Sequence, residues 1–169
     1  MDVHDLLTEV YGRLPGLVRA AVDGLSAEQL RQAPAPGANP VGWLVWHLTR
    51  IQDHHVADLL GEEQIWVSGD WTPRFGLPAD PDDTGFGHGR DQIAAVRPED
   101  GTALVGYFDA VADRTGRFLA GLTAVDLDRV VDDAWDPPVT LGVRLVSVAD
   151  DDLQHAGQAA YVRGLVLAD

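Results

Sequence analysis

Four segments of the chain repeat apolar residues in steps of three and four, and this periodicity restricts the fold more than any other feature. Such steps place the apolar side chains along one side of an α-helix, which must then be buried. The segments are residues 3–23, 40–59, 98–122 and 141–164. We therefore predict an all-α fold, a four-helix bundle around one core. Pro15 lies inside the first segment and predicts a kink there.

The second segment has a clear start, because Asn39 is suited to cap a helix and Pro40 to occupy its first position. At about 100° per residue, Trp43, His47 and His54 fall together beside the apolar stripe of this helix. These three side chains are expected to form one wall of a pocket.

Helices two and three of the predicted bundle are separated by residues 61–98, a connection too long to be a simple turn. Its aromatic residues, such as Trp66 and Trp71, argue against disorder. We predict a crossover that packs over one end of the bundle and covers the site. Within it the glycine-rich residues 83–90 are expected to be a tight surface loop. In the connection before the last helix, Trp135 could face the pocket, but a core anchor is the favoured interpretation.

A chain of 169 residues suits a single domain, residues 1–169, with enough length to bury a core. It contains no run of 18 apolar residues, and its first residues lack the basic and then apolar order of a signal peptide. The expectation is a protein of the cytoplasm that does not span a membrane. With no cysteine, the chain offers neither a disulfide nor a thiolate, so any thiol chemistry requires a small-molecule thiol.

The formal net charge of -15 excludes one large class of partners. Binding to a phosphate backbone depends on Lys and Arg, so nucleic acid is not an expected partner. The sequence also contains no lysine, which excludes a Schiff-base mechanism on the protein.

Two residues of the last helical segment point to a metal ion. Asp151 and His155 stand four residues apart, which places them on one face of a helix, one turn apart. With His47 from a neighbouring helix they would form a His/Asp/His site, and three protein ligands with an open position are typical of catalytic zinc. Asp152 also flanks His155, so the ligand could be either carboxylate; we favour Asp151. Zinc is the default metal, with Ni, Fe or Mn as alternatives.

Other side chains near these residues are candidates for supporting roles. His54 lies about 10 Å from His47 along the helix axis, too far to share one ion. We expect His54 to contact the substrate or to hydrogen-bond a metal ligand. Gln158 could contact a ligand or a neighbouring helix, and Trp43 could line the site. Arg50 or Arg163 could bind a substrate carboxylate.

The histidine of the second helix, together with Asp151-x-x-x-His155 and the residues that follow through Gly164, resembles the DinB-like metal-binding four-helix bundles. This group includes the mycothiol-dependent maleylpyruvate isomerases, whose Glu-x-x-x-His pattern is similar to Asp151-x-x-x-His155. The resemblance covers nearly the whole chain. It implies a homodimer and a metal ion that activates mycothiol or a related thiol.

The leading functional hypothesis is therefore a metal-dependent thiol-S-transferase or isomerase acting on a small electrophile. Two alternatives remain open at this stage. One is a metal-dependent hydrolase that uses a metal-bound water. The other is a non-catalytic, stress-associated metal-binding bundle. The substrate is not identified by the sequence.

Overall fold

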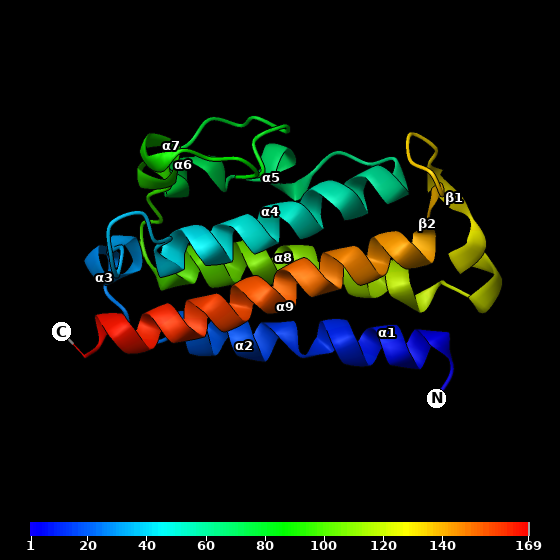
Figure 1. Cartoon of the computed structure of the whole chain (residues 1–169), viewed down its shortest axis with the longest axis horizontal. Helices are drawn as coiled ribbons and strands as arrows, with labels where there is room; N and C mark the ends of the chain where they lie inside the picture. Colours follow the sequence, from blue (N-terminus) through cyan, green and yellow to red (C-terminus); the bar gives the residue numbers. More distant parts are fainter. Residues whose placement is uncertain (169) are drawn as a thin grey trace.

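The computed structural model describes residues 1–168 and is built mainly of helices. Figure 1 shows the long helices lying side by side, with α1 and α2 following one another along a single line. The elements that make the bundle are α1 Val3–Gly12, α2 Leu14–Val22, α4 Val41–Leu60, α8 Gly101–Ala120 and α9 Leu141–Val166. The predicted all-α four-helix bundle is confirmed, with α1 and α2 together acting as its first helix.

The core lies between these helices, where α9 packs against α4 and α2, and α8 packs against the same two. Val18, Leu48, Phe108 and Leu145 are fully buried there, one from each helix of the bundle. Burial of each such side chain contributes about 1.5 to 3 kcal/mol. None of the helices within residues 1–168 is both long and apolar enough to cross a bilayer.

The first helix is interrupted as predicted, close to Pro15. α1 ends at Gly12 and α2 begins at Leu14, so that the proline falls in the first turn of the new helix. Proline has no N–H to donate and its ring clashes with the carbonyl four residues earlier, which explains the break at this point.

The start of α4 differs by one residue from the expectation. Pro40 has extended backbone angles and is itself the N-cap, so Val41 is the first helical residue and Asn39 does not cap the helix. The first helical hydrogen bond of α4 is donated by the amide of Leu44 to the Pro40 carbonyl at 3.0 Å. α4 ends at Gly61, whose φ of 66° lies in the left-handed region that glycine adopts without a steric cost.

The predicted crossover runs along the outer side of α4 (Figure 1) and contains three short helices. These are α5 Ile65–Ser68, α6 Thr72–Phe75 and α7 Arg90–Ala95. Arg50 of α4 is fully buried and donates to the carbonyls of Asp83, Pro81 and Asp80 at 3.0, 3.1 and 3.3 Å. Since these bonds satisfy the guanidinium, Arg50 anchors the crossover and is not available to a substrate carboxylate.

The remaining elements are short: α3 Ala27–Arg31, the 3₁₀ helix η1 Ala124–Asp128, and the antiparallel strands β1 Val130–Asp132 and β2 Val139–Thr140. The two strands form a hairpin at the end of the bundle where α9 begins. Trp135 lies in the turn between them and is 66% exposed. The interpretation of Trp135 as a core anchor is therefore wrong, because the hairpin turn is not covered by the bundle.

Candidate metal centre

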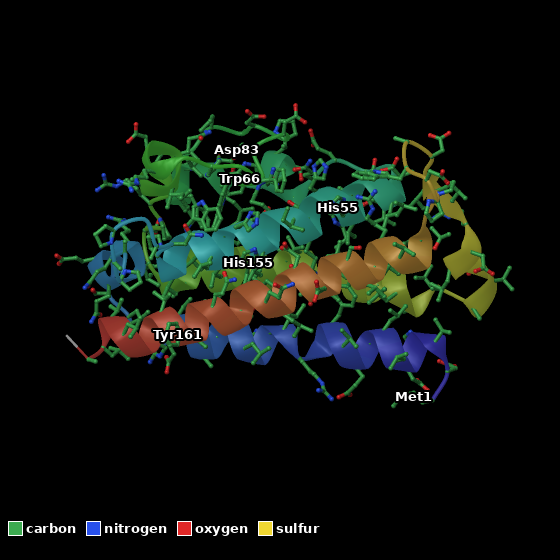
Figure 2. The ribbon with its side chains drawn as sticks, in the orientation of Figure 1. Met1, His55, Trp66, Asp83, His155 and Tyr161 are labelled. Carbon is green, nitrogen blue, oxygen red and sulfur yellow. The ribbon has the colours of Figure 1, made fainter. Side chains whose placement is uncertain are left out.

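The packing of α4 against α9 brings three potential ligands together. One ligand atom each from His47, Asp151 and His155 lies within 4.8 Å of the other two. His155 Nε2 is 3.6 Å from Asp151 Oδ1, and the centroids of the two imidazole rings are 4.7 Å apart. Figure 2 shows His155 about midway along α9, under the middle of α4. The structure thus assembles the three residues that the sequence had pointed to from two distant segments.

His47 is oriented by the backbone of the crossover. Its Nδ1 lies 2.5 Å from the Thr84 carbonyl, and because a carbonyl only accepts, Nδ1 carries the proton and donates it. This leaves Nε2 unprotonated and able to bind a metal ion. The ring also stacks on Trp43, with centroids 4.7 Å apart and planes 15° from parallel. Burial lowers the pKa of His47, although the bond to Thr84 opposes that effect, and a neutral imidazole is the form that binds metal.

His155 is oriented by a residue of its own helix. Its Nδ1 lies 2.8 Å from Gln158 Oε1, an acceptor, so Nδ1 again holds the proton and Nε2 faces Asp151. When His155 is protonated, its Nε2 also donates to the Asp151 carboxylate, which raises the pKa of His155, while burial acts in the opposite direction. Gln158 therefore acts on the site through His155, which is the role that carboxylates and amides often play behind a metal ligand.

The structure separates the two candidate carboxylates. Asp151 lies in the cluster and is partly exposed, whereas Asp152 is fully buried on a different face of α9. Neither oxygen of Asp152 has a hydrogen-bond partner within the described part of the chain. Burial, and next the charge of Asp151, raises the pKa of Asp152 well above its ordinary value, which favours the neutral form of this carboxyl.

The residues fit a divalent ion by two further criteria. Two imidazoles and one carboxylate form a donor set that suits Zn, Ni, Fe or Mn. Asp151 Oδ2 is buried without a partner among residues 1–168, and an orphaned carboxylate oxygen is costly unless something binds it. No other set of three such side chains within those residues meets the same distance criterion.

The glycine-rich residues 83–90 form a surface loop, as expected, and the buried Gly85 within this loop also contributes a wall of the site. Gly85 is buried against His47, and a Cβ atom there would lie 2.8 Å from His47 Nδ1 and 2.9 Å from the Trp46 ring. Only glycine permits this approach, since its φ of +88° is also left-handed. The sequence did not show this contact, because a backbone carbonyl and a missing side chain leave no recognisable motif.

His88 is a further member of this wall that the sequence did not single out. Trp43 Nε1 donates to His88 Nδ1 at 3.2 Å, so the proton of a neutral His88 lies on Nε2, which is 2.7 Å from Asp83 Oδ1. The His88 ring stacks on Trp46 with a centroid distance of 5.8 Å. These contacts tie the crossover to α4 directly above the cluster. Trp43 thus lines the site as expected, and it links His47 to His88.

His54 lies outside the cluster. Its Nδ1 is 3.1 Å from Gln64 Nε2, and Gln64 Oε1 accepts from Arg50 at 2.7 Å. His54 thereby belongs to the contacts that hold the crossover on α4, and it does not touch the proposed ligands. Of the other arginines, Arg163 is half-buried two turns beyond His155, about 12 Å along the axis of α9.

Fold and site together define a helical bundle with a candidate three-ligand site for a divalent metal. The sequence matches the DinB superfamily over residues 11–159, and the chain belongs to that superfamily. It is also similar to a crystal structure described as the conserved protein of locus from Enterococcus faecalis, with 32% identity and a TM-score of 0.91. That similarity covers 100% of this chain and 99% of the other. A comparison with curated proteins returned no match.

Proposed function

We propose that the protein is a metal-dependent enzyme of the thiol-S-transferase or isomerase type, acting on a small electrophile. The observation that carries the proposal is the convergence of His47, His155 and Asp151 with both Nδ1 atoms held by acceptors. That arrangement supports three protein ligands, and a site with three protein ligands keeps a position for an exogenous molecule.

A divalent ion held here would lower the pKa of a bound thiol and so supply a thiolate near neutral pH. The chain contains no cysteine, so the thiol has to be a small molecule. The similarity of Asp151-x-x-x-His155 to the pattern of the isomerases supports mycothiol as the first candidate. The protein's own groups bind the ion, keep protons on the two Nδ1 atoms and cover His47 with the crossover.

The test uses protein purified without an affinity tag, stripped of metal and reloaded with cobalt. Mycothiol should produce a sulfur-to-metal charge-transfer band, and the His155→Ala variant should show none. The affinity for the thiol should rise with pH until the free thiol ionises, at about 8.5 for an ordinary thiol.

The other outcomes distinguish the alternatives. Turnover of esters or amides without any thiol would identify a metal-dependent hydrolase and contradict the proposal. A gain in melting temperature on metal addition, with no spectral response to millimolar mycothiol, bacillithiol or glutathione, would instead indicate a non-catalytic metal-binding bundle.

The homodimer implied by the family resemblance also stays a proposal. Size-exclusion chromatography with light scattering should give twice the 18.2 kDa mass of one chain. A single-chain mass at micromolar concentration would contradict it.

A further inference from the structure

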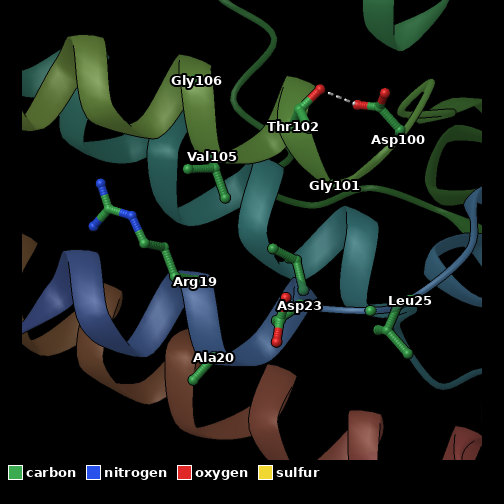
Figure 3. Close-up of a pocket in the computed structure, with 11 residues that line it drawn as sticks. Arg19, Ala20, Asp23, Leu25, Asp100, Gly101, Thr102, Val105 and Gly106 are labelled. Carbon is green, nitrogen blue, oxygen red and sulfur yellow. Dashed lines mark hydrogen bonds between the residues drawn. The ribbon is translucent and has the colours of Figure 1, made fainter.

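Two cavities differ in their relation to the cluster. The larger, about 710 Å³, lies between α2 and α8, where Arg19, Leu25 and Val105 are among its lining residues (Figure 3), and it shares no lining residue with the metal ligands. The smaller, about 340 Å³, is lined by Asp151 itself. We call this second cavity the α4–α9 pocket, because Ile51 and His55 of α4 and Val143 and Arg144 of α9 form its sides.

Two aromatic side chains lie at the α4–α9 pocket and are largely uncovered. Phe86 comes from the crossover and is 90% exposed, and Trp135 comes from the hairpin turn and is 66% exposed. Together with Ile51 and Val143 they give the pocket an apolar and partly aromatic lining. Such a lining is typical of a site for a small molecule with an apolar body, and the volume is at the small end of ligand pockets.

Four polar side chains line the pocket: Arg144 and His55 supply N–H groups, the Ser147 hydroxyl donates to the Val143 carbonyl, and Asp151 is the carboxylate of the cluster. Arg144 donates to His55 Nδ1 and to Asp132 Oδ2, both at 3.0 Å, which uses two of its N–H groups. A guanidinium carries five N–H groups and never accepts, so His55 Nδ1 must be the acceptor. Burial, followed by the charge of Arg144, lowers the pKa of His55 to about 4, so the imidazole is neutral and its proton lies on Nε2.

A fixed cation matters in a chain with a net charge of -15, because such a chain repels anions elsewhere on its surface. Asp132 holds the Arg144 guanidinium in place, and the Arg144 side chain is 20% exposed. Arginine binds a carboxylate through two parallel N–H groups, a geometry that lysine or a lone N–H group does not offer. Arg144 is thus placed to select an anionic ligand near Asp151.

We propose that the α4–α9 pocket binds the electrophilic substrate, and that this substrate is a small carboxylate with an aromatic or branched apolar body. The carboxylate binds Arg144, the body lies against Trp135 and Phe86, and the opposite end reaches the cluster beside Asp151. The inference rests on the proposed function in one respect, because it names the substrate class of the same site. Arg144 thereby takes the role that was expected of Arg50 or Arg163.

The test is calorimetric titration of the full chain with phenylacetate, with its neutral amide phenylacetamide, and with acetate. Phenylacetate should bind at least about tenfold more tightly than either of the others, since only it has both the charge and the apolar body. Arg144→Gln should remove the preference for the carboxylate over the amide. Arg13→Gln changes an arginine that pairs with Glu9 on the exposed side of α1 and should leave the preference intact.

A second variant keeps the proposal testable if Arg144→Gln does not fold. Trp135 is mostly exposed, so Trp135→Ala should fold normally and weaken phenylacetate and phenylacetamide alike, by about tenfold. Equal affinity for carboxylate and amide in the unchanged protein would overturn the proposal. So would a preference that survives Arg144→Gln, or binding that is insensitive to Trp135→Ala.

The same titration in His155→Ala separates this inference from the proposed function. Without a metal ion the carboxylate should still be preferred over the amide, although more weakly because the charge of Asp151 is no longer neutralised. Selective binding without any thiol response in the cobalt experiment would support the pocket and reject the thiol chemistry. A thiol response without selective binding would reject the pocket alone.

Discussion

At the scale of single residues, His47 and His155 both direct Nε2 toward the cluster, but different contacts orient the two rings. The carbonyl of Thr84 in the crossover orients the His47 ring, whereas Gln158, three residues later on the same helix, orients the His155 ring. One orientation thus depends on tertiary packing and the other on helix geometry alone. The Gln158 contact is available within α9 itself, whereas the Thr84 contact forms only when the crossover is docked.

The two neighbouring carboxyls should respond differently to the same substitution. Asp151→Asn removes the charge of a proposed ligand and should abolish stoichiometric zinc binding, as should His155→Ala. Asp152→Asn replaces a buried carboxyl that is outside the cluster, and it should retain close to one equivalent of metal. Elemental analysis of the untagged variants measures both. Loss of metal in Asp152→Asn with retention in Asp151→Asn would reverse the assignment.

Gly85 provides a test of how His47 is positioned. A methyl group at this residue would lie 2.8 Å from His47 Nδ1, so Gly85→Ala must displace either the imidazole or the Thr84 carbonyl. Zinc affinity should fall about 10- to 100-fold, the usual effect of losing the partner behind a metal ligand. A competition assay with a chromogenic chelator measures the change.

Gly87→Ala is the matched control for this prediction. Gly87 belongs to the same loop and has a similar left-handed φ of +75°, but a Cβ atom there would have no neighbour within 4 Å. Both alanine variants therefore carry a similar backbone cost of about 1 kcal/mol, and only Gly85→Ala adds a steric conflict with His47. Equal losses of zinc affinity would show that backbone strain, not the contact with His47, is responsible.

At the scale of elements, α4 holds the crossover through one buried cation. The guanidinium of Arg50 donates to three backbone carbonyls of the crossover shortly before Thr84, those of Asp80, Pro81 and Asp83. The candidate ligand His47 lies three residues earlier on the same helix, so one helix carries both this candidate ligand and the anchor of the segment that orients it. The crossover is consequently a part of the site and not merely a connection.

The contact between α4 and α9 at His55 should make stability depend on acid. The pKa of His55 is lowered to about 4 by burial, then by Arg144 and His54, with Asp58 and Asp151 acting in the opposite direction. An unfolded histidine binds its proton near pH 6.5, so the unfolded chain takes up more protons as the pH falls from about 6.5 to about 4. The free energy of unfolding should therefore decrease across that range, by up to about 3 kcal/mol.

Urea unfolding of metal-free protein at several pH values measures this dependence. His55→Asn keeps an acceptor near the position of Nδ1 but does not titrate, so its unfolding free energy should depend less steeply on pH between 6.5 and 4. Arg144→Gln should reduce the slope only in part, because burial remains. An unchanged slope in His55→Asn would contradict the prediction.

At the scale of the whole molecule, a bound ion would connect two helices that are far apart in the chain, with the crossover closed over one of them. Metal should therefore stabilise the bundle as a unit. An ion present at 100 times its dissociation constant adds about 2.7 kcal/mol, which corresponds to a rise in melting temperature of about 5 to 10 °C for a chain of this size.

Differential scanning calorimetry before and after chelation tests this rise. His155→Ala should melt at the same temperature with and without zinc, because it lacks one proposed ligand. A rise of equal size in that variant would place the stabilising metal elsewhere.

Much of the bundle and of the candidate ligand set could be predicted from the sequence because both depend on local periodicity. Apolar steps of three and four specify a helix that buries one face, and Asp151 and His155 share a face of α9 because they are one turn apart. The break before Pro15 follows equally from the missing N–H group of proline. Each of these inferences uses interactions within a few residues.

Tertiary structure alone decided which carboxylate joins the cluster and how His47 is oriented. These features involve groups that are distant in sequence or that belong to the backbone. The rotation of α9 against its neighbours puts Asp151 at the cluster and Asp152 in the core. The Thr84 carbonyl has no side-chain signature, and the close approach of Gly85 to His47 exists only once the crossover is docked. Helical periodicity describes which side of a helix is buried, but the partner across that interface is determined by how the helices pack.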